Sequence, residues 1–259
     1  MHGNPGQAYS SRLLNRESAG VLAVTATPVT AAELLGRVES AIRSGDPLTI
    51  VGHNLHSVYH FHSSDWFREF YDRCEIVLTD GRPVLAAINQ QRRSEGLRPY
   101  RADRRVGSTD WIPQAFALDE VRRVCVLGAT KASNDAMLSR FSRPGIDLLG
   151  IPADPWDEDH LAAAASKIRN FDPDLVIIGM GMPLQERVCS ELIARDVSAV
   201  IALVGGAIDQ LSGAQRNAPR WLGPLGLEWM WRLASQPKRL AHRYLVEPVK
   251  LALLLTKAR

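Results

Sequence analysis

The sequence predicts an α/β fold: a Rossmann-like, mostly parallel sheet with helices on both faces and a helical C-terminal appendage. Two observations lead to this prediction. Apolar runs of strand length alternate with amphipathic stretches of helix length, which is the pattern of successive βαβ units. The chain has 259 residues, of which 46% are hydrophobic, so it can bury a substantial core.

The expected elements follow one another along the chain at this pitch. The first helix spans Ala31 to Ser44, and a second begins near His56 and continues to Phe70. The later helices are Ser133–Phe141, Asp159–Phe171 and Leu184–Arg195. The expected strands are Leu48–Gly52, Glu75–Thr79, Val124–Leu127, Ile146–Leu149, Leu175–Ile178 and Ala199–Val204.

Composition divides the chain into three parts. Residues 1–26 are polar and rich in Gly, Ser and Asn, which is typical of a disordered tail. Residues 27–212 form the α/β core, and residues 213–259 form a basic appendage in which Glu247 is the one acid from Pro237 onward. Its leucines, mixed with basic residues, suit contact with an anionic membrane surface. The cations in question are Lys238, Arg239, Arg243, Lys250, Lys257 and Arg259.

Net charge, cysteine content and hydropathy limit the classes of function that the chain could have. The net charge of +3 is too mild to indicate a nucleic-acid partner. Three scattered cysteines without metal-binding spacing are typical of a reduced, cytosolic protein. The N-terminus lacks an apolar signal region, and no apolar run reaches the roughly 18 residues of a membrane span. We therefore expect a cytoplasmic protein, whose basic appendage could contact a membrane surface peripherally.

Candidate site residues stand where expected strands end, since ligands of such sheets bind at the carboxyl ends. Asp80-Gly81 follows one strand, and its carboxylate could accept a proton, although an Asp-Gly turn is the simpler interpretation. The stretch Gly179–Glu186 ends another strand and opens a helix, which favours an anion. The loop Arg104–Asp110 could equally be a helix N-cap.

Metal binding is not predicted. Asp172-Pro173-Asp174 precedes a strand, at the edge away from the expected ligand. His56 and His60 have the i, i+4 spacing of a metal pair, but no carboxylate or cysteine completes it within the motif. We expect neither a metal site nor a cofactor.

Arginines and a glycine pair distinguish the C-terminal stretch. Val204–Asp209 contains the pair Gly205-Gly206, and Arg232, Arg239 and Arg243 follow. Guanidinium groups match phosphate oxygens bidentately, so these arginines suit a pyrophosphate. The alternative is a docked helix with ordinary solvated cations.

Four motifs, in order, resemble those of the WecG/TagA/CpsF glycosyltransferases, and the resemblance covers most of residues 30 to 245. They are Asp80-Gly81 with Pro83-Val84, the loop Arg104–Asp110, the string Gly179–Glu186, and the stretch from Val204 to Tyr244. The resemblance implies an inverting, metal-independent glycosyltransferase. It would move a hexose or N-acetylhexosamine from a UDP-sugar donor to a polyprenyl-pyrophosphate-linked sugar acceptor in exopolysaccharide, capsule or teichoic acid synthesis.

The same resemblance implies roles for individual residues. Asp80 would be the general base, and Arg105 would contribute to the active site. The substrate-binding residues would be Asn54, Arg105, Gln185, Gly205, Asp209, Arg232, Arg239 and Arg243. The last three arginines would close over the donor pyrophosphate and do the work of a metal.

Departures and alternatives accompany this interpretation. Asn217 stands where the family usually has an arginine, with Arg216 one place early, and His53 replaces a frequent threonine. Homo-oligomerisation is left open. Two other classes are a non-catalytic membrane-associated scaffold and a nucleotide-cofactor oxidoreductase. The second is disfavoured because Gly128-Ala129-Thr130 is only a fragment of a dinucleotide-binding motif.

Overall fold

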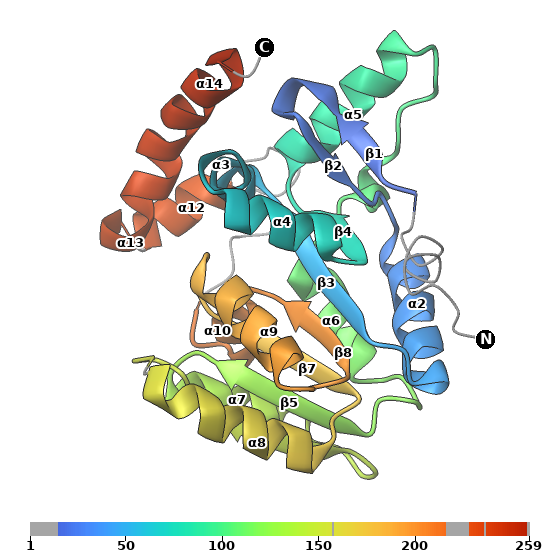
Figure 1. Ribbon diagram of the computed structural model, residues 1–259, viewed down its shortest axis with the longest axis vertical. Helices are drawn as coiled ribbons and strands as arrows, with labels where there is room; N and C mark the ends of the chain where they lie inside the picture. The colour runs from blue at the N-terminus through green and yellow to red at the C-terminus, as the bar shows by residue number, and fades with distance from the viewer. Residues whose placement is uncertain (1–14, 157, 216–227, 236, 258–259) are drawn as a thin grey trace, which may run out of the picture.

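The computed structural model describes residues 15–156, 158–215, 228–235 and 237–257, and its centre is a parallel sheet of six strands (Figure 1). The strands lie in the order β4-β3-β8-β7-β5-β6, and each hydrogen-bonded pair is parallel. The α/β fold class is therefore confirmed, and each strand lies within two residues of its expected bounds. The strands are β3 (Leu48–His53), β4 (Ile76–Thr79), β5 (Arg123–Gly128), β6 (Asp147–Ile151), β7 (Leu175–Gly179) and β8 (Val200–Leu203).

Each face of the sheet has its own apolar core, because successive strand side chains point to opposite faces. On β7, Leu175 and Ile177 belong to one core, whereas Val176 and Ile178 belong to the other. Helices contributing to the first core are α2 (Ala31–Ser44), α6 (Ser108–Ala115), α7 (Lys131–Phe141) and α10 (Ala207–Ser212). Those contributing to the second are α3 (Leu55–Ser63), α4 (Asp65–Arg73), α5 (Arg82–Ser94), α8 (Leu161–Phe171) and α9 (Leu184–Ala194).

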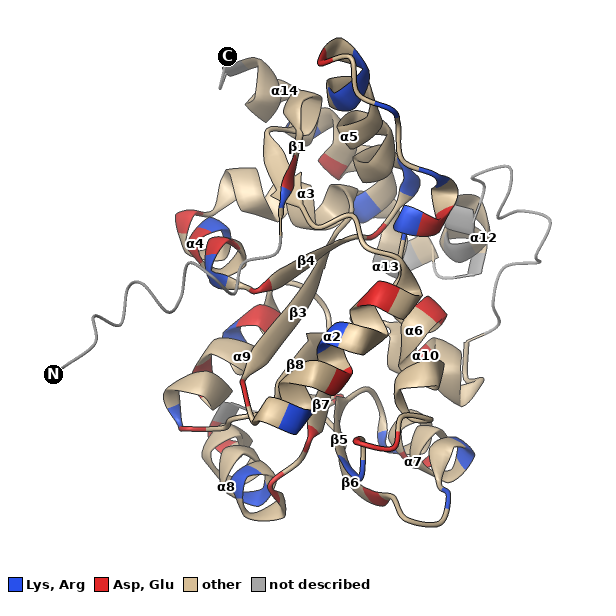
Figure 2. Ribbon diagram, turned by 90° about the vertical axis from the view of Figure 1, so that its right-hand side faces the viewer, with Lys and Arg blue, Asp and Glu red and all other residues tan. Residues whose placement is uncertain are grey.

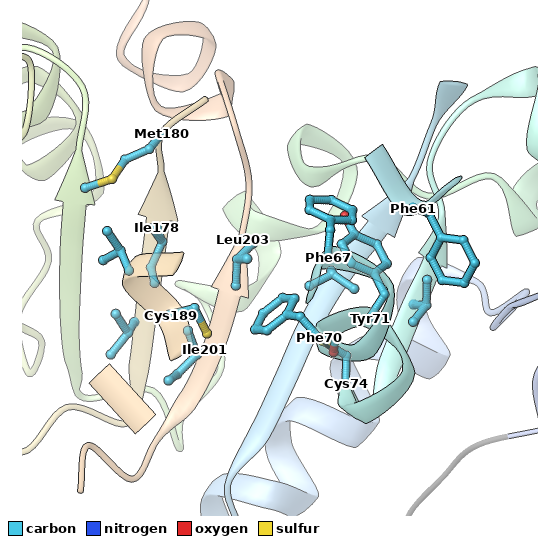
Figure 3. Close-up of a cluster of buried hydrophobic side chains, with 14 of the residues drawn as sticks. Phe61, Phe67, Phe70, Tyr71, Cys74, Ile178, Met180, Cys189, Ile201 and Leu203 are labelled. Atoms are coloured by element: carbon cyan, nitrogen blue, oxygen red, sulfur yellow. Dashed lines mark hydrogen bonds between the residues drawn. The ribbon is translucent and has the colours of Figure 1, made fainter. Parts of the chain in front are cut away.

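Aromatic residues of α4 contribute large buried side chains to the second core. Phe67 and Tyr71 stack with ring centroids 4.6 Å apart, and both are buried. Figure 3 shows Phe70 between these rings and the aliphatic side chains of β8. All three cysteines are free and buried, so in this structure they are part of the packing.

Residues 15–26 correct the expected disordered tail. Glu17–Ala19 (β1) and Val24–Ala26 (β2) form an antiparallel pair joined by a 3₁₀ turn, η1 (Gly20–Leu22), and the pair packs on α5. The hairpin buries Ala19, Val24 and Ala26, and Arg92 of α5 contacts Glu17 at 2.6 Å. The segment is held by tertiary contacts with α5, which local composition does not reveal.

The single helix expected from His56 to Phe70 is also corrected. It is two helices, α3 and α4, that meet at Ser64. The backbone of Ser64 is extended, and its hydroxyl accepts a hydrogen bond from the Phe67 amide at 3.4 Å. Ser64 is thus the N-cap of α4, a position that serine favours.

The C-terminal segment lies beside α3, as the red helices of Figure 1 show. It consists of α12 (Glu228–Ser235), α13 (Pro237–Ala241), a π-helical turn η4 (His242–Val246) and α14 (Glu247–Lys257). Leu251 of α14 is buried in the second core. Among the helices of the described ranges, none is both long enough and apolar enough to cross a membrane.

A glycine at the end of β5 gives a test of this packing. Gly128 has φ of +126°, and a Cβ there would lie 2.3 Å from the carbonyl oxygen of Gly179. We expect Gly128→Ala to destabilise the fold by roughly 3 kcal/mol or more, because both strain and a backbone collision result. Urea denaturation measures this. Gly45→Ala is the control, since Gly45 has φ of +69° but no atom within 4 Å of the added Cβ, so it should cost about 1 kcal/mol. Equal losses of stability in the two variants would contradict this expectation, because they would show that the backbone relieves the collision at residue 128.

Candidate active site

Asp80 and Asn54 meet at the carboxyl edge of the sheet. They follow the neighbouring parallel strands β4 and β3, and the Asn54 Nδ2 donates to the Asp80 Oδ2 at 3.1 Å. The Asn54 Oδ1 caps α3, accepting from the amides of His56 at 3.0 Å and Ser57 at 3.2 Å. Because its oxygen is held by the helix amides, the amide group of Asn54 presents its donor to the carboxylate.

Two glycines allow the surrounding backbone to approach Asp80. A Cβ on Gly52 would lie 3.0 Å from the Asp80 Cβ, and one on Gly107 would lie 3.3 Å from the Asp80 Oδ1. The loop that carries Gly107 is tied to β4, since the Val106 amide donates to the Thr79 carbonyl at 3.1 Å. The carboxylate of Asp80 therefore lies beside two other segments of chain, the junction of β3 with α3 and the loop that carries Gly107.

Arg105 stands in the same loop. Its guanidinium lies 3.9 Å from the carboxylate of Asp110, and its side chain is one-third exposed at 33%. Asp110 also accepts from the Gly107 amide at 2.8 Å. The structure thus brings Arg105 to the edge that holds Asp80 and Asn54.

The side chain of Gln185 contacts the loop that follows β8. It is buried with 1% exposure, its Oε1 accepts from the Gly205 amide at 3.0 Å, and its Nε2 donates to Glu186 at 2.9 Å. In this arrangement its amide supports the loop after β8, where Gly205 has φ of +55°. Contact of Gln185 with a substrate stays a prediction.

The C-terminal residues reach the site in part. The Arg243 guanidinium on η4 donates to the Asn54 Oδ1 at 3.5 Å. Asp209 lies on the first turn of α10 and is partly exposed. Arg232 lies on α12 and Arg239 on α13, but their side chains are outside the described residues. Arg216 and Asn217 also lie outside them.

His53 is the last residue of β3, and its side chain points into the core. It is buried, stacks on Tyr71 with centroids 4.7 Å apart, and its Nδ1 lies 3.1 Å from the Ser57 hydroxyl. Burial lowers the pKa of this imidazole to about 3, so the ring is neutral at physiological pH. It therefore acts in this structure as a core aromatic.

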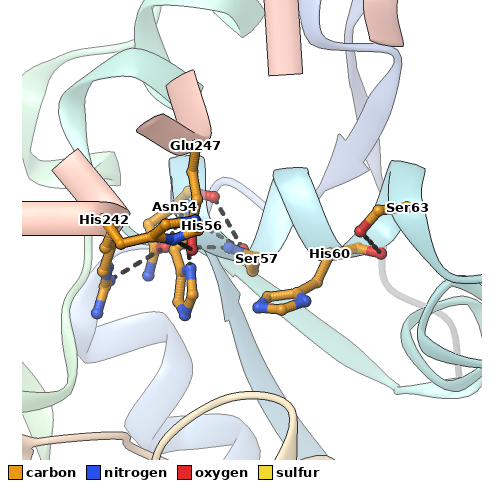
Figure 4. Close-up of polar contacts among 8 residues, drawn as sticks. Asn54, His56, Ser57, His60, Ser63, His242 and Glu247 are labelled. Carbon is orange, nitrogen blue, oxygen red and sulfur yellow. Dashed lines mark hydrogen bonds and ion pairs between the residues drawn. The ribbon is translucent and has the colours of Figure 1, made fainter. Parts of the chain in front are cut away.

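A polar cluster that sequence reasoning missed lies beside Asn54. The His56 Nδ1 is 2.5 Å from the Glu247 Oε2, and the His242 Nδ1 is 3.5 Å from the other oxygen of that carboxylate (Figure 4). The His56 and His60 rings lie 4.6 Å apart. The i, i+4 histidine spacing was a signal, but its carboxylate comes from the far end of the chain.

The aspartates of Asp172-Pro173-Asp174 are engaged at the opposite edge. The Asp174 carboxylate accepts from the amides of Arg122 at 2.9 Å and Arg123 at 2.7 Å, at the start of β5. Asp172 contacts the guanidinium of Arg123 at 2.7 Å. As expected from their position before β7, these acids do not face Asp80.

Basic residues follow one another along the end of α5 and the loop beyond it, coloured blue in Figure 2. Arg92 and Arg104 are paired, with Glu17 and Glu33 respectively. Arg93, Arg98 and Arg101 are exposed. The loop that contributes Arg105 to the site thus also carries a positive surface.

Glu186 provides a pH-dependent test of this region. It is fully buried, and burial raises the pKa of its carboxyl from 4.5 to about 7. The folded state therefore binds the proton more tightly, so stability falls as pH rises from about 4.5 and the full cost is present above about pH 7. We expect Glu186→Gln to remove about 3 kcal/mol of this loss between pH 4.5 and pH 8.

Urea denaturation of both proteins at each pH measures the difference, which isolates Glu186 from the other titrating groups. The glutamine oxygen can still accept from Gln185, so the local hydrogen bond is kept. Parallel pH profiles for the two proteins would contradict the raised pKa.

Comparison with known proteins agrees with these motifs. A family model described as the glycosyl transferase WecG/TagA/CpsF family matches residues 19–259. An N-acetylglucosaminyldiphosphoundecaprenol N-acetyl-beta-D-mannosaminyltransferase of Bacillus subtilis (strain 168) is 32% identical over 120 residues, and this match spans 46% of each chain, about half the relative's length. A protein of the same name from Staphylococcus aureus (strain MW2) is 24% identical over 234 residues, covering 87% of this chain and 88% of that one. The chain therefore belongs to the glycosyl transferase WecG/TagA/CpsF family.

Proposed function

We propose that this enzyme transfers a hexose or N-acetylhexosamine from a UDP-sugar to a polyprenyl-pyrophosphate-linked sugar, with inversion and without a catalytic metal, in cell-surface polysaccharide synthesis. The names of the relatives support the acceptor class, since they describe N-acetylglucosaminyldiphosphoundecaprenol as the acceptor. The observation that carries the proposal is the oriented carboxylate of Asp80, held by Asn54 at a sheet edge that Arg243 also reaches.

Asp80 acts as the general base. As the acceptor hydroxyl attacks the anomeric carbon, its proton passes to the Asp80 carboxylate and the bond from that carbon to the UDP oxygen breaks. A single in-line displacement inverts the anomeric configuration. The hydrogen bond that Asn54 Nδ2 donates to Asp80 Oδ2 fixes the orientation of the carboxylate that receives the proton.

Positive groups stabilise the departing UDP. Arg243 is seated next to Asn54, and Arg105 lies on the loop beside Asp80. Arg232 and Arg239 belong to the same appendage and join them as the donor binds. Guanidinium groups neutralise the developing phosphate charge, which is the work a divalent ion does elsewhere. Gly205 and Asp209 line the donor side, and Gln185 supports the loop that carries Gly205.

The appendage also contacts the membrane that carries the acceptor. Leu245, Val249 and Leu253 recur at every fourth position of η4 and α14, and they are 59%, 62% and 59% exposed. Exposed Lys250 lies beside this stripe. In Figures 1 and 2, α14 and the basic loop after α5 lie at the same end of the molecule. An apolar stripe flanked by cations suits an anionic lipid interface and supports a peripheral location on the inner face of the cell membrane.

The other functional classes are weaker. Family membership favours a glycosyltransferase over a cofactor-dependent oxidoreductase. A non-catalytic scaffold would keep the apolar stripe of α14, but it would have no use for a carboxylate enclosed by two glycines and oriented by an amide.

Replacing the base tests the reaction. We expect Asp80→Asn to lower turnover by about a hundredfold or more, because the amide cannot accept the proton, while UDP binding is kept. The measurement is UDP release from a panel of UDP-sugars with a short-chain lipid-pyrophosphate-sugar acceptor and anionic vesicles. The control is Asp147→Asn, an exposed aspartate at the amino end of β6. Turnover retained in Asp80→Asn would reject Asp80 as the base.

Polar substitution of the stripe tests the membrane contact. We expect the combined Leu245→Ser, Val249→Ser and Leu253→Ser variant to bind anionic vesicles at least about tenfold more weakly, because three aliphatic side chains no longer leave water. Vesicle flotation measures binding, and circular dichroism checks the fold. Ile193→Ser on α9, where Ile193 is 47% exposed, is the control. Unchanged binding of the triple variant would contradict the proposed surface.

A further inference from the structure

Two histidines of α3 and a glutamate of α14 bring three metal-binding groups together. The candidate ligand atoms of His56, His60 and Glu247 all lie within 4.8 Å of one another. His56 and His60 are one helical turn apart on the same face of α3, and Figure 4 shows both rings below the Glu247 carboxylate. Glu247 begins α14, 191 residues from His56 in the sequence.

The cluster is largely shielded from water. The side chains of His56 and Glu247 are 14% and 8% exposed. The Nε2 of His60 is buried and has no hydrogen-bond partner among the residues that the structure describes. Buried polar atoms nearly always have a partner, so an unpaired ring nitrogen beside a carboxylate and a second imidazole needs an explanation. A metal ion would supply the missing partner.

The donor set suits zinc. Two imidazole nitrogens and one carboxylate oxygen form a familiar zinc environment, in which the ion lies about 2.0–2.2 Å from each ligand atom. Tetrahedral ligands at that length are about 3.3 Å apart, so atoms that lie within 4.8 Å of one another would need to approach by about 1.5 Å at most. The 2.5 Å contact between His56 and Glu247 would open as the ion enters. His242, 3.5 Å from the second carboxylate oxygen and 60% exposed, lies close enough to become a fourth ligand.

The charges around the cluster include one that opposes a bound cation and one that favours it. The guanidinium of Arg243 is near enough to influence His60 and Glu247, and it opposes a cation. The carboxylate of Glu247 offsets this, and it is already shared between two histidines. A zinc ion would bind this carboxylate together with the His60 nitrogen that has no other partner among the described residues.

We propose that His56, His60 and Glu247 bind a zinc ion that fastens α14 to α3. The site is separate from the reacting carboxylate of Asp80, and its role is to hold the appendage rather than to activate a substrate. Because α3 begins directly after Asn54, the ion would also keep Arg243 in place beside that residue. The zinc site stands independently of the proposed transfer reaction, since its test measures binding alone.

Zinc titration of the tag-free, EDTA-treated full chain tests the site. We expect one zinc ion per chain by calorimetry, and a Co²⁺ absorption spectrum typical of tetrahedral nitrogen and oxygen ligands. His60→Ala and Glu247→Gln should each weaken zinc binding by more than about a hundredfold, since even residues that only orient ligands cost roughly 10–100-fold. His160→Ala, at an exposed histidine of η3 (Glu158–His160), is the control and should bind as the unaltered chain does. No zinc uptake, or equal uptake by all four proteins, would overturn the proposal.

Hydrogen–deuterium exchange tests the fastening. We expect zinc to slow amide exchange in α14 of the unaltered chain and to have no such effect in His60→Ala. Glu247→Gln serves as the second variant, because its side chain keeps the size of the original and removes only the charge. Zinc binding without added protection of α14 would overturn the fastening role. Failure of either measurement leaves the UDP-release assay of Asp80→Asn unaffected, so the two proposals are tested apart.

Discussion

The parallel register of β3 and β4 is the constraint on which the candidate site depends. It sets His53 opposite Thr79, so the residues that follow, Asn54 and Asp80, leave the sheet side by side. A shift of two residues would keep every strand side chain on its own face but would move Asp80 by roughly 7 Å along the strand. The hydrogen bond between Asn54 and Asp80 therefore reports the register directly. The burial of both strands on both faces makes this register costly to change.

Much of this arrangement could be predicted from the chain, because buried parallel strands appear as continuous apolar runs and their ends are marked by Gly or Asp. Asp80 was singled out in this way, whereas Asn54 was indicated by the family resemblance. The hairpin of residues 17–26 was not, since its strands are three residues long and depend on α5 for their burial. The break at Ser64 was missed because the aromatic periodicity continues across it, although serine is a good N-cap.

Two other features of the structure depend on contacts between residues distant in the sequence. Gln185 has a polar side chain of a kind that can bind a ligand. Only the structure shows that its amide is hydrogen-bonded between Gly205 and Glu186. The histidines of α3 lack a local carboxylate, and Glu247 completes the cluster only when α14 docks. Local patterns predict which elements form, whereas these contacts depend on which elements meet. The paired side chains Asp172 and Asp174 show the opposite case, because strand direction alone excludes them from the site.

Asn54 takes part in three arrangements: it caps α3, it orients Asp80, and it accepts from Arg243 of the appendage. Sharing of this kind has a thermodynamic consequence. If docking of the appendage stabilises the ordered arrangement of Asn54 and Asp80, it strengthens the binding of any ligand that requires this arrangement. By linkage, that ligand stabilises the docked appendage by the same free energy. Ligand binding at the sheet edge and docking of the C-terminal helices are thus coupled. The ligand affinity has to be given together with the docked or undocked state of these helices, and the docking equilibrium together with the ligand occupancy.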